Sequence, residues 1–150
     1  MKKTWIYYGV FFSDKTKQAI LEYAKYWIYK KFNNDIPDDW KIYCDHVTLV
    51  FNDGTPKAQK VADFYEKMLN QYVSMHITHI GISNKSIAFQ VDCKTENKHS
   101  HITVAVASDA KPVNSNDIEN WYELDENDWY TISGAYYVSG KINKVVPSKK

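Results

Sequence analysis

The chain has 150 residues, of which 44% are hydrophobic and 15% aromatic, and its 19 basic and 18 acidic side chains leave a formal charge of +1. This length predicts one domain, residues 1–150, with a sizeable core, and the apolar content excludes a disordered chain. The charge excludes a strongly basic domain that grips a long nucleic acid by its backbone, but it allows a small anion in a local cleft.

Sequence periodicity predicts alternating strands and helices, with Ser13 as the N-cap of the first helix. In chain order, the expected elements are a strand over Thr4–Phe12, a helix over Asp14–Lys31, a strand over Lys41–Phe51, a helix over Lys57–Tyr72, strands over Met75–Ser83, Ser86–Cys93 and His101–Ser108, a short helical turn from Ser115 or Asn116 to Trp121, and one or two strands over Trp129–Val146. A helix before each group of strands predicts an α+β fold of two related lobes, each an antiparallel sheet backed by a helix.

Targeting and redox signals favour the cytoplasm. Cys44 and Cys93 lack a Cys-x-x-Cys spacing, which argues against a zinc site and against a disulfide framework. Met1 to Lys3 lead straight into a strand instead of the apolar core of a signal peptide. No run approaches the ~20 apolar residues that cross a membrane, so we expect no membrane partner.

Two strands carry the same motif, a histidine and a threonine two positions apart among aliphatic residues. These motifs are His46-Val47-Thr48 and His101-Ile102-Thr103. Residues two apart on a strand point to one face, so each motif places an imidazole beside a hydroxyl. Random placement predicts about 0.3 such triplets in this chain, whereas three occur. If the two strands face each other, two histidines flank a reacting phosphodiester and two hydroxyls hold its oxygens.

The paired motifs, the opening strand Tyr7–Phe12 with its helix, and the later segment Lys111–Asn116 resemble the two-histidine (2H) phosphoesterase superfamily. The resemblance covers nearly the whole chain and points to tRNA-ligase cyclic phosphodiesterase domains and phage anti-CBASS nucleases. It implies two lobes around a central cleft, and a metal-independent phosphodiesterase that needs no cofactor. Members act on 2′,3′-cyclic phosphates, RNA ends or cyclic oligonucleotides used as immune signals. The catalytic quartet that the resemblance implies is His46, Thr48, His101 and Thr103.

Histidine chemistry explains how such a quartet would work. An imidazole with a pKa near 6.5 accepts or donates a proton at neutral pH. One histidine would deprotonate the ribose 2′-OH that attacks the phosphorus, and the other would protonate the departing 5′-oxygen. With a 2′,3′-cyclic substrate, water would replace the 2′-OH. The two threonines would donate hydrogen bonds to the non-bridging oxygens, and the sequence does not assign base and acid to particular histidines.

Other interpretations of the histidines remain open. His46, His99 and His101 could bind zinc, although no acidic residue or cysteine completes that set convincingly. The third triplet, His76-Ile77-Thr78, follows the second helix, and we interpret His76 and His79 as ordinary strand residues. Single strand histidines are often polar groups whose hydrogen bonds are simply satisfied by the fold.

Two further residues are expected to bind substrate. Tyr7 shares a strand face with Gly9, which would leave room for a ligand beside an aromatic ring, with core packing as the alternative. Lys111 could meet a phosphate, although an exposed loop lysine is usually only solvated. Trp129, Tyr136 and Tyr137 could form a flap over a base, but they fit better as sheet residues.

The sequence therefore predicts a 2H phosphodiesterase that cleaves 3′–5′ bonds of cyclic di- or trinucleotides in anti-CBASS immune evasion. One alternative is a 2′,3′-cyclic phosphodiesterase of RNA repair. Another is a catalytically silent module that sequesters cyclic nucleotides, which turnover would distinguish from either enzyme.

Overall fold

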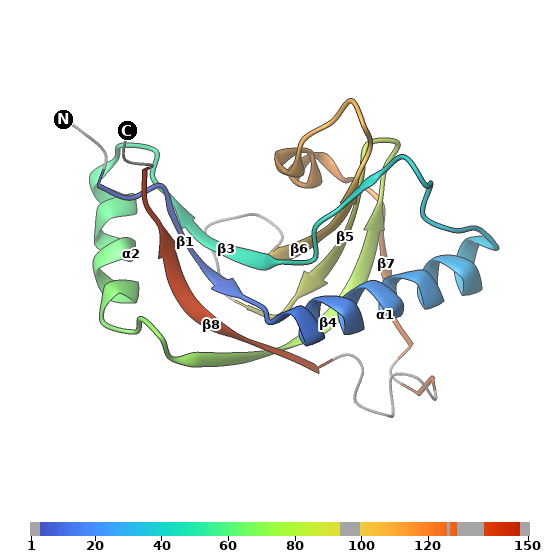
Figure 1. The fold of residues 1–150 in the computed structure, drawn as a ribbon, viewed down its shortest axis with the longest axis horizontal. Helices are drawn as coiled ribbons and strands as arrows, with labels where there is room; N and C mark the ends of the chain where they lie inside the picture. Colours follow the sequence, from blue (N-terminus) through green and yellow to red (C-terminus); the bar gives the residue numbers. More distant parts are fainter. Residues whose placement is uncertain (1–3, 94–99, 126, 129–136, 148–150) are drawn as a thin grey trace.

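The computed structural model describes residues 4–93, 100–125, 127–128 and 137–147, and this part of the chain has an α+β fold, as predicted (Figure 1). Its elements are β1 (Tyr7–Phe11), α1 (Asp14–Phe32), β2 (Lys41–Ile42), β3 (His46–Phe51), α2 (Pro56–Glu66), β4 (Tyr72–Ile82), β5 (Ser86–Val91), β6 (His101–Val106), the 3₁₀ turn η1 (Pro112–Asp117), β7 (Trp121–Glu123) and β8 (Tyr137–Val145).

The strands form one continuous antiparallel sheet in the order β2-β6-β3-β1-β8-β4-β5, with β7 on β4 and a further pairing of β5 with β6. The two expected sheets are therefore joined. The long strand β4 joins them, because Tyr72–His76 pair with β8 whereas Ile77–Ile82 pair with β5. Figure 1 shows the resulting two halves, with β1, β3 and β8 on one side and β5, β6 and β7 on the other.

Helix α1 packs its apolar stripe on the sheet. The Ser13 hydroxyl accepts a hydrogen bond from the Thr16 amide, and Asn33 ends the helix in a left-handed conformation. The stripe consists of Ile20, Ala24, Trp27 and Ile28, which are buried, and Leu21, which is partly buried. Tyr23 is fully buried as well, with its ring 5.4 Å from that of Phe89 on β5. Neither described helix is long and apolar enough to span a membrane.

Helix α2 is shorter than the predicted Lys57–Tyr72. It begins at Pro56 after its N-cap Thr55 and ends at Glu66. Asn70 then has a φ of 71°, a left-handed conformation that a helix does not continue through. Tyr72 is accordingly the first residue of β4 and is 73% exposed. The last residues of the predicted helix, 67–72, therefore form a turn and the start of β4.

The C-terminal third also departs from the expected elements. The helical turn lies earlier than predicted, at Pro112–Asp117, because proline suits the first position of a turn. Trp121 begins the strand β7 and pairs with Gly81 of β4. Of the three aromatic residues that fit better as sheet residues than as a flap, Tyr137 is a sheet residue in β8, and Trp129 and Tyr136 lie outside the described residues.

Candidate active site

The two His-x-Thr motifs meet where β3 and β6 pair. Val47 lies opposite Ile102 in an antiparallel register, and both side chains are fully buried. The residues before and after each of them therefore point to the other face. In an antiparallel pair this register sets each histidine across from the threonine of the other motif. The four residues on that face are His46, Thr48, His101 and Thr103.

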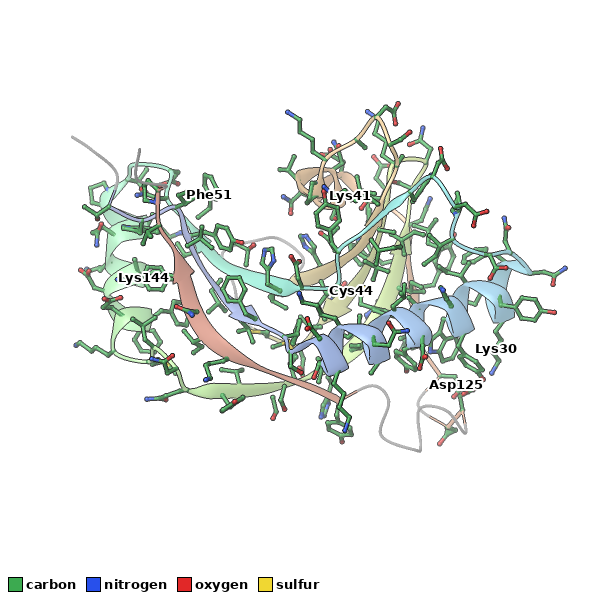
Figure 2. The ribbon with its side chains drawn as sticks, in the orientation of Figure 1. Lys30, Lys41, Cys44, Phe51, Asp125 and Lys144 are labelled. Carbon is green, nitrogen blue, oxygen red and sulfur yellow. The ribbon has the colours of Figure 1, made fainter. Side chains whose placement is uncertain are left out.

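These four side chains line one cavity of about 630 Å³. Its wall comes from β1, β3, β6, η1 and the segment before β3. The lining residues are Tyr7, Tyr43, Asp45, His46, Thr48, Phe51, His101, Thr103, Pro112, Val113 and Asn116. In Figure 2, Phe51 lies on the left half and Lys41 on the right half, and Cys44 lies below Lys41. The structure thus brings the two motifs together in one cavity.

A bend before β3 adds a carboxylate that sequence periodicity did not identify. The predicted strand Lys41–Phe51 is interrupted, and Cys44 has a φ of 57°, which is uncommon outside glycine. The Cys44 amide donates to the Thr103 carbonyl at 2.9 Å, so the bend rests on β6. On a regular strand Asp45 would point away from its neighbour His46. Because of the bend, both residues line the same cavity.

His46 is held at both ring nitrogens. Its Nδ1 lies 3.0 Å from Oδ1 of Asp45, and its Nε2 lies 3.1 Å from Oγ1 of Thr48. The hydrogen bond from His46 lowers the pKa of the Asp45 carboxyl, so that Asp45 is ionised at neutral pH. A carboxylate can only accept, which requires the hydrogen on Nδ1 of His46. In the neutral form of the ring, Nε2 then carries the lone pair and accepts from the Thr48 hydroxyl at the cavity wall.

Aromatic rings cover the His46 imidazole. The ring of Tyr7 stacks on it at a centroid distance of 5.1 Å, and that of Phe11 at 5.4 Å. Both rings also close over Gly9, where an added Cβ would lie 2.8 Å from the Val47 carbonyl oxygen. Tyr7 thus lines the cavity, but Gly9 gives room to the two rings and to β3, not to a ligand. Burial raises the pKa of the Tyr7 hydroxyl, which keeps it protonated.

Lys111 and the third triplet lie apart from this cavity. Lys111 is exposed and caps η1 through its backbone, while its neighbours Pro112 and Val113 reach the cavity wall. The backbone amide of His76 donates to Asp92 at 2.6 Å, and Nδ1 of His79 lies 2.9 Å from the Thr78 hydroxyl. His76 and His79 are therefore strand residues with local contacts, as interpreted from the sequence.

The zinc alternative involves a residue that the structure does not describe. His99 lies in the segment 94–99, outside the described ranges. Within the described part of the chain, no group of three or more histidine, cysteine, aspartate or glutamate side chains is arranged to hold a metal ion.

Comparison with known proteins agrees with this geometry. The profile of the fungal tRNA ligase phosphodiesterase domain matches residues 28–146, which is more than half of the chain and includes both His-x-Thr motifs. No curated protein matches the chain. This domain is of the 2H phosphoesterase type and acts as a cyclic phosphodiesterase, a hydrolase. The chain belongs to the family of fungal tRNA ligase phosphodiesterase domains and is a phosphodiesterase.

Proposed function

We propose that the protein cleaves 3′–5′ bonds in small cyclic oligonucleotides, with His46 as general base and His101 as general acid. One observation carries the choice of substrate, namely that apolar and aromatic side chains line both sides of the catalytic quartet. Tyr7 and Phe51 come from β1 and β3, and Tyr43 and Val113 come from the opposite wall. Aromatic side chains stack on any nucleobase, so this arrangement suits a phosphate with a base on each side.

The hydrogen bonds of His46 support its role as base. With its Nδ1 hydrogen donated to Asp45, its Nε2 carries the lone pair that can accept a proton. In the structure Nε2 lies beside the Thr48 hydroxyl. A bound ribose 2′-OH would take that place, and Thr48 would then turn its own hydrogen to a non-bridging phosphate oxygen. The 2′-oxygen attacks phosphorus as its proton moves to His46.

His101 completes the reaction from the other strand. In its protonated form it gives a proton to the 5′-oxygen as the bond from phosphorus to that oxygen breaks. The products are a 2′,3′-cyclic phosphate on one nucleoside and a free 5′-hydroxyl on the next. Thr103 donates to the second non-bridging oxygen as negative charge builds on the phosphate. The ring is thereby opened to a linear product of the same base composition.

The charges of the cavity favour a compact substrate with few charges. The chain contains no arginine, and no lysine is among the described residues that line the cavity. Among the described residues that line the cavity, a protonated histidine is then the positive charge available to the reacting phosphate. This suits a singly charged diester. A long nucleic acid would need a track of basic side chains along its backbone. A volume of about 630 Å³ falls within the range of about 300–1,000 Å³ of small-molecule sites.

The family match favours a second candidate, hydrolysis of 2′,3′-cyclic phosphates at RNA ends. Residues 28–146 match a tRNA ligase phosphodiesterase domain, and RNA repair by such a domain fits the same quartet. Water would then occupy the place of the 2′-OH beside His46. This reaction needs a nucleobase on only one side of the phosphate, so it leaves one wall of the cavity without a contact. Cyclic oligonucleotides use both walls, and in that role the enzyme would destroy an immune signal in the cytoplasm of the infected host.

A substrate panel tests the proposal. Chelator-treated protein is incubated with cyclic di- and trinucleotides and with 2′,3′-cyclic AMP, and products are identified by mass. We expect ring opening to a terminal cyclic phosphate or 3′-phosphate. Hydrolysis of 2′,3′-cyclic AMP alone would support the RNA-repair candidate instead. Tight binding of a cyclic oligonucleotide without any product would support the sequestering alternative.

Variants of the two histidines link the activity to the cavity. His46→Ala and His101→Ala should each lower kcat by at least about 10²-fold, because general acid–base catalysis contributes this much. Ligand binding, measured by calorimetry, should be largely retained. His79→Ala is the matched control, since His79 is a strand histidine outside the cavity lining. Wild-type rates in both catalytic variants would refute the assignment.

A further inference from the structure

Three hydroxyl groups form a chain from the interior of the protein to the cavity. Oγ of Ser86, at the start of β5, lies 2.7 Å from Oγ of Ser115 on η1. Oγ of Ser115 in turn lies 2.9 Å from Oγ1 of Thr103 on β6. Ser86 and Ser115 are 0% and 1% exposed, whereas Thr103 lines the cavity. The row of three hydroxyls therefore has a buried end at Ser86 and an open end at Thr103.

Burial fixes the direction of the hydrogen bonds. A hydroxyl has one hydrogen to donate, and a buried donor without an acceptor is costly. If Thr103 donated to Ser115 and Ser115 to Ser86, the hydrogen of Ser86 would be left inside the protein at the closed end. In the opposite direction Ser86 donates to Ser115, and Ser115 donates to Thr103. Every buried hydrogen is then bonded, and the hydrogen of Thr103 is left for the cavity.

We propose that Ser115 is a positioning residue that makes Thr103 a hydrogen-bond donor to the substrate phosphate, and that Ser86 in turn orients Ser115. The proposal rests on the proposed function, in which Thr103 contacts a non-bridging oxygen. By accepting from Ser115, the Thr103 oxygen becomes a stronger donor, since hydrogen bonds in a chain polarise one another. The donor is also preorganised, because its hydrogen points to the cavity before the substrate binds.

The short turn η1 serves two purposes in this arrangement. Its Pro112, Val113 and Asn116 line the cavity, while Ser115 from the same turn points into the protein. The turn is fixed at its start, where the Lys111 amide donates to the side chain of Asn114 at 2.9 Å. The turn that walls the substrate site therefore also holds the hydroxyl that directs Thr103.

A double-mutant cycle separates positioning from a merely structural role. The variants are Thr103→Ala, Ser115→Ala and the two combined, assayed on the fastest substrate of the panel above. We expect kcat to fall about 10²-fold in Thr103→Ala, because removal of one oxyanion donor costs this much. Ser115→Ala should lower kcat about tenfold with little change in KM. In the Thr103→Ala background it should have an effect of less than about twofold, because Ser115 acts through Thr103.

Two further variants control for folding. Ser115→Ala leaves the Ser86 hydrogen without its acceptor, so some loss of thermal stability is expected. Ser86→Ala/Ser115→Ala removes that unsatisfied hydrogen, and it should regain melting temperature without regaining kcat. Ser139→Ala is the matched control, because Ser139 forms a similar pair with Ser74 at 2.7 Å on an exposed part of the sheet. It should retain the wild-type rate.

The outcomes distinguish the two proposals. A wild-type rate for Thr103→Ala would overturn the role of Thr103 in the proposed function, and the positioning role with it. If Thr103→Ala is slow but Ser115→Ala is as fast as wild type, the positioning role alone is overturned. Equal factors for Ser115→Ala in both backgrounds, or recovery of kcat in Ser86→Ala/Ser115→Ala, would show a structural effect instead.

Discussion

Replacing Asp45 by asparagine tests whether the carboxylate fixes His46 as the base. The bond from Nδ1 of His46 to Asp45 is 3.0 Å long, and hydrogen bonds to charged groups contribute about 1.5–3 kcal/mol. The side chains of His46 and Asp45 are 23% and 40% exposed, so solvent screening reduces this to about 1–2 kcal/mol. Asp45→Asn should therefore lower kcat by about 5- to 30-fold. An amide that donates to Nδ1 would lower it further, because it favours the hydrogen on Nε2.

The assay is the initial rate of cleavage of the best substrate at pH 7, with Asp92→Asn as the matched control. Asp92 lies 3.5 Å from the ring of His76, and both residues are outside the cavity lining. Its replacement therefore removes a similar contact between a carboxylate and an imidazole without changing the site. We expect a wild-type rate for this control. A rate for Asp45→Asn within twofold of wild type would refute the reasoning about the tautomer.

The same variant has a signature in stability. The pKa of Asp45 is lowered in the folded protein by the hydrogen bond from His46. A lowered pKa stabilises the folded state above the unfolded pKa of about 3.9, and this stabilisation is lost as the pH falls through the folded pKa. Urea unfolding should therefore show a gap in unfolding free energy between wild type and Asp45→Asn at pH 6 that closes as the pH falls through the lowered pKa of Asp45. A gap that widens on acidification would contradict the assigned sign.

Three other changes test the cavity and its surroundings. Phe51→Ala should raise KM by about tenfold through loss of nucleobase stacking. Phe64 on α2 is an aromatic residue of similar exposure, and Phe64→Ala should leave KM unchanged. Equal KM values for the two variants would remove Phe51 from the site. Burial raises the pKa of the Cys44 thiol to about 12, so iodoacetamide at pH 8 should alkylate the less buried Cys93 first, as read by peptide mass. Gly9→Ala places a Cβ 2.8 Å from a backbone oxygen of β3. It should lower the free energy of unfolding in urea by about 1–3 kcal/mol. An unchanged urea midpoint would show that the strands can separate there.

The sequence alone determined the α+β class and most elements, because these depend on local periodicity. The stripe of α1 repeats every third or fourth residue, and the strands alternate, and these periods agree with the observed burial of residues such as Trp27 and Val47. The end of α2 did not follow, since Tyr72 fits an amphipathic helix as well as a strand, and only the pairing of β4 with β8 decides between them.

The same distinction applies to the candidate site. Alternation within each strand placed an imidazole beside a hydroxyl twice, and this was enough to single out four residues that line one cavity. That β4 is shared by both halves of the sheet, and that Val47 lies opposite Ile102, are long-range pairings that no local pattern encodes. Asp45 was missed because strict alternation points it away from His46, and the left-handed Cys44 cancels that alternation.

Ser115 and Ser86 illustrate what only the tertiary structure decides. The two serines are 29 positions apart, and small polar residues in turns carry no signal of burial. Packing of η1 against β5 and β6 buries both hydroxyls and directs one of them to Thr103. The sequence determined which side chains could do phosphodiester chemistry, because that depends on residue type and strand periodicity. The tertiary structure decided which groups orient them, because a hydrogen bond depends on distances between segments far apart in the chain.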